Sequence, residues 1–421
     1  MNKFIREKYV VFFLFLGLYL SLLIGLHLNE DNLGGAAHDS IYHFKISEKL
    51  NENFLKTFNE FGNLEKTRNS PVFWIFLSFL SNFFSYQTIQ FLNTFLIFPF
   101  TYYFYKCLKI KYKKINSIYL IILSSYLFLS PSLRSLIIWP YSLSWGLLFF
   151  IISIYYFLRY QNDLNLSNSL KIISSLVVAS YIYPSFSVFY LFYIYKIFNG
   201  SSNKTTFFIT LIISLIMSLP CLYYIFTRDV ISSFQDSQGV GVSFSKSFNL
   251  SNKILIISTI CFYALLPIIN FQELIKKILT TEKKKILVII IFCLINFYFF
   301  NFPHSVWGGG FFHKLSNVVF NNNYLFFLFS FISILFLLTI ANKNFDNYFL
   351  FIILILYNPQ FTIYIKYFDP LIFVTFLTLF NFNLKENFLE KSYKFYQFYG
   401  FIFLYYVAIY SKKMYFLDLK F

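Results

Sequence analysis

The chain has 421 residues, of which 58% are hydrophobic and only 13% are charged. Soluble domains carry about 25% charged residues, so this composition excludes an ordinary soluble globular protein. The net charge of +17 does not indicate a nucleic-acid partner. The Lys and Arg residues lie in short loops between apolar segments, where they fix topology and contact anionic lipid headgroups.

Apolar segments long enough to cross a bilayer recur along the whole chain. We therefore expect an all-α polytopic membrane protein with about 11–13 transmembrane helices, forming a single transmembrane domain over residues 1–421. The first predicted span is Val10–Leu28, which we interpret as a retained helix rather than a cleaved signal. Further spans are predicted near 88–106, 115–132, 137–158, 171–184, 185–198, 206–226, 254–271, 286–302, 324–341, 347–361, 370–383 and 396–410.

Basic residues before the first span place the N-terminus in the cytoplasm and residues 29–87 outside, as a first extracytoplasmic loop. Within this loop, Pro71–Phe84 is apolar but short for a span. If it crossed the membrane, the basic run Lys106–Lys114 would fall outside; if it is an interfacial helix, that run falls inside. The positive-inside bias favours the interfacial helix. Residues 88–421 are then a helical bundle in the cell (inner) membrane, with larger outside loops at 227–253 and 302–323.

The first outside loop contains the motif GGAAHDSIYHF at residues 34–44. Its carboxylate, Asp39, lies beside His38 and His43. A carboxylate at a membrane surface can act as a general base or bind a divalent cation. Asp39 also precedes an apolar periodic run, so the alternative is a solvated loop acid or a helix N-cap.

The same loop continues with RNSPVFW at residues 68–74. Pro71 is expected to open the interfacial helix at its first turn. Arg68 could contact either a phosphate group or an ordinary lipid headgroup.

The next outside turn reads SPSLRSLIIWPYS, residues 130–142, and Arg134 is the only charge between Lys114 and Arg159. An ionisable group at the membrane edge is costly unless it has a partner. An anionic headgroup or a lipid-linked phosphate would suit the guanidinium through paired hydrogen bonds. Snorkelling to ordinary lipid is the alternative.

The loop NFPHSVWGGGFFHKLSN, residues 301–317, contains three consecutive glycines. Such a backbone can approach a ligand closely, and its N–H groups together with a lysine can hold a phosphate. The alternative is a flexible interfacial turn with an aromatic anchor. The candidate residues are His304, Trp307, Gly308, Gly309, Gly310, His313 and Lys314.

The last outside turn reads YIKYFDPLIF, residues 364–373. We expect Asp369 to cap the following helix with Pro370 in its first turn. Lys366, beside Tyr367, is available for an anionic ligand.

Together these motifs resemble the C-type (GT-C) membrane glycosyltransferase superfamily, which includes mannosyl-, aminoarabinosyl- and glucosyltransferases dependent on polyprenyl- or dolichyl-phosphate sugars. The resemblance rests on the order of HDSIYHF after the first span, NSPVFW about 30 residues on, and SPSLR after two further spans, and it covers roughly residues 1–160. The chain departs from the family in having the single Pro71 instead of a double proline, and His38-Asp39 instead of an acidic pair.

The resemblance implies an inverting transfer of a sugar from a polyprenyl-phosphate donor to a glycan, lipid or protein acceptor on the extracytoplasmic face. It implies that Asp39 is the general base and that Arg134 and Lys366 stabilise the departing phosphate. We add Lys314 to the predicted phosphate-binding residues. His38, His43, Arg68, His304, Trp307 and the three glycines are predicted to contact substrate.

No cofactor is predicted, unless Asp39 binds a divalent cation. Two other functions remain open. A lipid-linked glycan polymerase or ligase would share the membrane setting and the outside arginines. A flippase or transporter would need ionisable residues in mid-span, and the predicted spans contain almost none.

Overall fold

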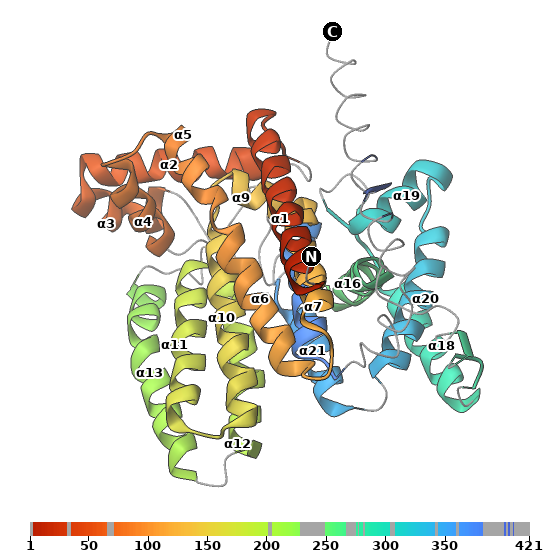
Figure 1. Cartoon of the computed structure of the whole chain (residues 1–421). Coiled ribbons are helices and arrows are strands. Elements are labelled where there is room, and N and C mark those ends of the chain that lie inside the picture. Colours follow the sequence, from red (N-terminus) through yellow and green to blue (C-terminus); the bar gives the residue numbers. More distant parts are fainter. Residues whose placement is uncertain are drawn as a thin grey trace. The chain divides into compact units, whose positions relative to one another are not determined.

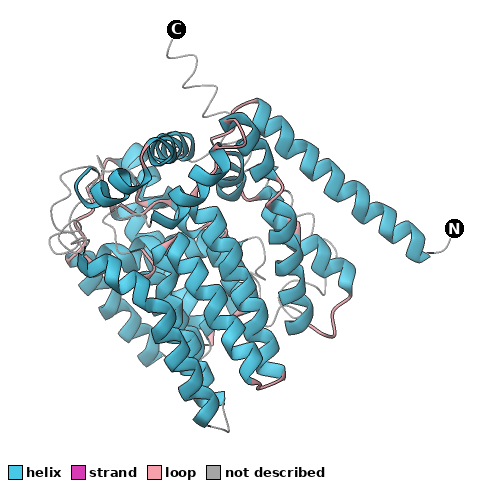
Figure 2. Cartoon of the chain, turned by 90° about the vertical axis from the view of Figure 1, so that its left-hand side faces the viewer, coloured by secondary structure: helices cyan, strands magenta, loops and turns pink. Residues whose placement is uncertain are grey.

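The computed structural model describes residues 3–31, 35–64, 71–200, 204–227, 249–266, 283–303, 308–341, 344–358 and 362–381, with a few isolated positions besides. Within these residues every regular element is a helix, as predicted (Figure 2). The chain divides into two compact units, residues 1–236 and 237–421, which are described separately.

The first unit begins with the long helix α1 (Lys3–His27), and its helices continue to residue 227 (Figure 1). The others are α2 (Ala36–Glu52), α3 (Phe54–Leu64), α4 (Pro71–Ser81), α5 (Tyr86–Thr94), α6 (Ile97–Lys111), α7 (Ser117–Ser124), α8 (Tyr126–Leu129), α9 (Pro131–Ile138), α10 (Ser142–Asn162), α11 (Leu166–Ile182), the 3₁₀ helix η1 (Pro184–Val188), α12 (Phe189–Gly200) and α13 (Lys204–Thr227).

The second unit is built around α16 (Leu250–Leu265), which packs against five of the helices described there. The other helices described there are α18 (Lys283–Tyr298), α19 (Gly310–Phe320), α20 (Tyr324–Ala341), α21 (Phe345–Leu356), α22 (Ile365–Phe368) and α23 (Leu371–Thr378). Most of α16 is buried, and its neighbours are α18, α19, α20, α21 and α23.

Several helices are apolar and long enough to cross a membrane. In the described residues these are α10, α13 and α20. Two bent pairs, α4 with α5–α6 and α7–α8 with α9, raise the number to five if each is one span. Four shorter apolar helices lie at Val11–His27, α11, α16 and α21. The prediction of about 11–13 spans is larger because it counts short and broken apolar helices as spans. A hydropathy pattern does not show where a helix bends.

Two prolines mark helix ends where the sequence predicts them. Pro71 opens α4, which ends at Ser81 before the chain turns by 113° into α5 and α6. Pro184 opens η1 and separates α11 from α12, as expected from the divided run 171–198. A proline fixes its own φ and lacks a backbone donor, so it fits the first turn of a helix best. Pro220 inside α13 shows that an interior position is also occupied in this chain.

The segment Pro71–Phe84 is therefore a short helix packed against α2, and not one straight span. Its buried residues Phe73, Trp74 and Leu77 share a cluster with Ile46 and Leu50 of α2. Trp145, in the first turns of α10, and Ile182, at the end of α11, pack against the same cluster. The two short helices α2 and α4 are thereby fixed at one end of the longer helices α10 and α11.

Candidate functional site

Asp39 lies in the first turn of α2, where its backbone N–H donates to the Gly35 carbonyl at 2.9 Å. The alternative of a helix N-cap is wrong, because the helix begins three residues earlier and Gly35 occupies the cap position with φ of 89°. A carboxylate in the first turn is favoured by the partial positive charge of the helix N-terminus. Asp39 is half-buried, and the neighbouring His38 is exposed. The carboxylate is thus held by a rigid element at a partly open position.

Asp31 helps to fix this helix start. Its Oδ2 accepts a hydrogen bond from the Ala37 backbone N–H at 3.3 Å. Asp31 is not among the predicted site residues, since nothing in its local sequence distinguishes it from the other loop acids.

Arg134 forms a buried ion pair with Glu30 of the same unit. Its Nε donates to Glu30 Oε1 at 2.8 Å and its Nη2 to Oε2 at 2.7 Å. The remaining guanidinium N–H groups donate to the Ser21 carbonyl at 2.8 Å, the Ser21 hydroxyl at 3.0 Å and the Phe128 carbonyl at 3.4 Å. Both charged side chains are almost fully buried, at 3% and 1% exposed.

A guanidinium has five N–H donors, and the five bonds to Glu30, Ser21 and Phe128 use all of them. The expected phosphate partner of Arg134 is therefore replaced by a carboxylate from the end of α1. The expectation that this charge needs a partner was sound, but the partner lies 104 residues away in the sequence. Arg134 acts as a clamp between α9 and the chain after α1, and not as an open phosphate site.

The clamp is closely packed on both sides. A Cβ on Gly25 would lie 2.1 Å from Glu30 Oε2 and 2.9 Å from Arg134 Nη2, so only glycine fits there. Trp139 donates its indole N–H to the Glu30 carbonyl at 3.0 Å. Since Asp31 follows Glu30 and holds the start of α2, the clamp also fixes the position from which the helix carrying Asp39 begins.

His43 is buried and packs between α2 and α4. The indole N–H of Trp74 donates to its Nδ1, and its ring contacts Phe73 and Tyr141 edge-on or tilted. Because an indole only donates, Nδ1 is unprotonated here. The predicted substrate contact of His43 is corrected to a packing role, since the residue belongs to the buried stripe of α2.

In the second unit, the triple glycine contacts protein backbone instead of leaving room for a ligand. Gly308, Gly309 and Gly310 all have positive φ. The Gly309 N–H donates to the Ile363 carbonyl at 3.0 Å, and a Cβ on Gly308 would lie 2.6 Å from that oxygen. As predicted, another group comes close to the glycine backbone. That group is the 362–364 segment of the same unit, and not a ligand.

Two lysines are buried around this segment. Lys366 in α22 is 6% exposed and lies over the rings of Tyr364 and Tyr367, 5.4 and 5.8 Å from their centroids. Lys253, in the first turn of α16, is 1% exposed and donates to the Asn358 carbonyl. The sequence analysis missed Lys253 as a candidate, although a lone lysine at the start of the apolar run LSNKILIIS was a usable signal.

The turn after Lys366 differs from its expected form. Asp369 ends α22, its N–H donates to the Ile365 carbonyl at 2.9 Å, and it is joined to Pro370 by a cis peptide bond. The N-cap of α23 is Pro370, without a side-chain capping bond. The expected capping role of Asp369 is therefore wrong by one residue.

His313 and Lys314 lie on α19. His313 is fully buried among the rings of Phe300, Phe302 and Phe326. Partial burial lowers the pKa of Lys314. The predicted contacts Arg68, His304 and Trp307 lie outside the described residues. Within the described part, no group of three or more His, Cys, Asp or Glu side chains could hold a metal ion, so the divalent-cation alternative gains no ligand set there.

A basic cleft lies at the other end of the first unit's long helices, where α6 and α10 end. Its cavity of about 530 Å³ is lined by Lys106, Lys109, Lys113 and Arg159 together with Asp163. Trp145, at the opposite end of α10, packs on Phe76 of α4. One 21-residue helix thus separates the cleft from the cluster that carries α2.

The first unit therefore holds Asp39 on a helix fixed by a buried ion pair, and the second holds two buried lysines beside a glycine-rich contact. Comparison with known proteins does not assign the chain to a family: no family model, no curated protein and no solved structure matches it.

Proposed function

We propose that the protein is a membrane glycosyltransferase that moves a sugar from a polyprenyl-phosphate donor to a hydroxyl-bearing lipid, glycan or protein acceptor. The observation that carries the proposal is the placement of Asp39. This carboxylate is partly open, lies in the first turn of α2 and belongs to a helix whose opposite face is buried against α4. A general base must be held within hydrogen-bond reach of the proton that it removes.

In the proposed reaction, Asp39 takes the proton of the acceptor hydroxyl. The acceptor oxygen attacks the anomeric carbon of the donor sugar, and the bond between that carbon and the phosphate oxygen breaks with inversion. The polyprenyl phosphate leaves with the bonding electrons. Negative charge grows on this phosphate in the transition state, so a pre-positioned cation lowers the barrier. With Arg134 committed to Glu30, Lys366 remains the residue to which the resemblance gives this role.

The proposed orientation places α2 outside and the basic cleft inside. At about 1.5 Å per residue, α10 is about 30 Å long, which matches the hydrocarbon core of a bilayer. Its two ends differ sharply: Trp145 belongs to the aromatic cluster of α4, and Arg159 belongs to the basic cleft. Basic residues concentrate on the cytoplasmic side of membrane proteins. This distribution supports an extracytoplasmic Asp39.

The buried charges argue against coupled transport as the function. In the described residues they are Glu30, Arg134, Lys253, Lys366 and Asp369. Each lies in a connecting segment, a helix of at most eight residues or the first turn of a longer helix. Transporters place such groups in mid-span, facing a cavity.

The test is sugar transfer by membranes containing the protein, with synthetic polyprenyl-phosphate sugars of several kinds as donors. Asp39→Asn should lose transfer by about 10²–10⁴-fold, the usual contribution of a general base. Glu48→Gln is the matched control, because it removes the same charge from an exposed position of the same helix. Full activity of Asp39→Asn, with normal insertion, would overturn the proposed mechanism. Transfer of a preassembled lipid-linked oligosaccharide, and of no single sugar, would favour the polymerase or ligase.

A further inference from the structure

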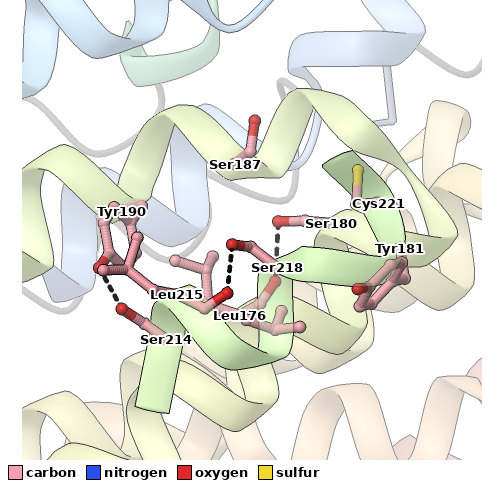
Figure 3. Close-up of a pocket in the computed structure, with 10 residues that line it drawn as sticks. Leu176, Ser180, Tyr181, Ser187, Tyr190, Ser214, Leu215, Ser218 and Cys221 are labelled. Atoms are coloured by element: carbon pink, nitrogen blue, oxygen red, sulfur yellow. Dashed lines mark hydrogen bonds between the residues drawn. The ribbon is translucent and has the colours of Figure 1, made fainter. Parts of the chain in front are cut away.

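A cavity of about 240 Å³ lies among α11, η1, α12 and α13 of the first unit (Figure 3). It is formed by the second halves of α11 and α13 together with the start of α12, and its lining includes Ser180, Tyr190, Ser218 and Cys221. The site proposed for sugar transfer does not use any of these residues. The cavity therefore needs an explanation of its own.

The hydroxyl groups around the cavity are largely satisfied within the protein. Ser180 donates to the Leu176 carbonyl and Ser218 to the Leu215 carbonyl, both at 2.8 Å. The hydroxyls of Tyr190 and Ser214 bond to one another, as Figure 3 shows. A ligand that brings polar groups gains little here, because a buried polar group is stable only with a hydrogen-bond partner. The remaining wall is apolar, so the cavity suits hydrocarbon.

The cavity borders the most exposed of the candidate spans. Only 11% of the apolar stretch of α13 is buried inside the protein, and Leu215, which lines the cavity, is 55% exposed. In a bilayer, the exposed apolar face of a spanning helix is covered by lipid chains. Hydrocarbon is thus present at the mouth of the cavity wherever the protein is inserted.

We propose that this cavity binds one acyl chain of a bilayer phospholipid, which packs between α11 and α13. None of the ten lining residues is charged, so no cation is present to select a phosphate-bearing polyprenyl lipid. A site that recognises only hydrocarbon binds the most abundant hydrocarbon around it. In a bilayer, that is the acyl chain of a phospholipid. The bound chain then supplies packing contacts that α11 and α13 do not make with each other. This inference depends on the membrane setting alone, and not on sugar transfer.

The test uses vesicles of phosphatidylethanolamine and phosphatidylglycerol that contain a small fraction of phospholipid with a photoreactive acyl chain. In the wild-type chain, cross-links should fall on the cavity-lining parts of α11 and α13. Ser218→Phe and Ser180→Phe fill the cavity from opposite helices, and each should lose this labelling. Leu219→Phe is the matched control, because Leu219 is 57% exposed and does not line the cavity; it should keep the labelling.

Unchanged labelling in both filled variants would overturn the proposal. Preferential labelling of the same peptides by a photoreactive polyprenyl phosphate, present at equal concentration, would also overturn it. Cys221 gives a measurement that needs no substitution, since it lines the cavity while the other three cysteines are buried. Its alkylation by a maleimide in detergent should slow when phosphatidylglycerol is added back. An alkylation rate that ignores added phospholipid would contradict an acyl chain in this site.

Discussion

The carboxylate of Glu30 and the guanidinium of Arg134 meet in a buried, two-point ion pair that joins the end of α1 to α9. A buried pair is not in itself strongly stabilising, but removing one partner leaves an uncompensated buried charge. The pair therefore makes the local fold depend on both residues.

Arg134→Ala should lower the free energy of unfolding by about 3–5 kcal/mol, the usual cost of breaking a buried pair from one side. Arg159→Ala, at an exposed position of α10, should change it by less than about 0.5 kcal/mol. Unfolding in detergent, followed by circular dichroism, measures both. Equal stability of the two variants would show that the buried pair does not hold α1 to α9.

Gly25→Ala should destabilise the same junction, because the added methyl would collide with the Glu30 carboxylate at 2.1 Å. Overpacking of this kind costs about 1–3 kcal/mol. Gly17→Ala on the same helix meets nothing within 4 Å and should be neutral or slightly stabilising, since alanine favours helix more than glycine does. Thermal unfolding of the two variants compares them directly. If Gly25→Ala unfolds at the same temperature as the wild type, the ion pair between Glu30 and Arg134 can shift without loss of stability.

Gly308→Ala should destabilise the second unit by at least about 2 kcal/mol. The new methyl would lie 2.6 Å from the Ile363 carbonyl oxygen, and the φ of +97° disfavours any side chain. Gly200→Ala serves as the control, because its Cβ would make only ordinary contacts at 3.6 Å. Protease protection of the 308–320 region reports the difference. Similar protection in both variants would argue against a fixed contact between the glycines and Ile363.

Lys366→Gln should reduce sugar transfer by about 10²–10³-fold, as expected when a cation facing developing phosphate charge is removed. Lys283→Gln removes an exposed lysine of α18 and should leave transfer unchanged. Separate values of kcat and KM for the donor distinguish transition-state stabilisation from simple binding. If Lys366→Gln keeps full kcat, the phosphate of the proposed reaction is held elsewhere.

Part of this architecture could be predicted from the sequence, because it depends on the chemistry of single residues and their neighbours. Pro71 and Pro184 open helices because a proline has a fixed φ and no amide donor wherever it stands. The long apolar segments predict helices, because helices and closed barrels are the folds that satisfy every backbone group in lipid, and every regular element described is a helix. Asp39 was identified as a carboxylate at the start of a helix, and the structure moves it only from the cap into the first turn.

The partners of the buried charges could not be predicted from the sequence. Arg134 meets Glu30 across 104 residues, and Gly309 meets Ile363 only when the second unit has folded. Nothing near Glu30 in the sequence distinguishes a buried charge from a solvated one. Burial depends on which distant helices pack around a residue. The sequence by itself therefore determined the all-helical class, the proline breaks and the need of Arg134 for a partner. Only the tertiary structure decided that this partner is a protein carboxylate, because long-range packing chooses between the protein and a lipid phosphate.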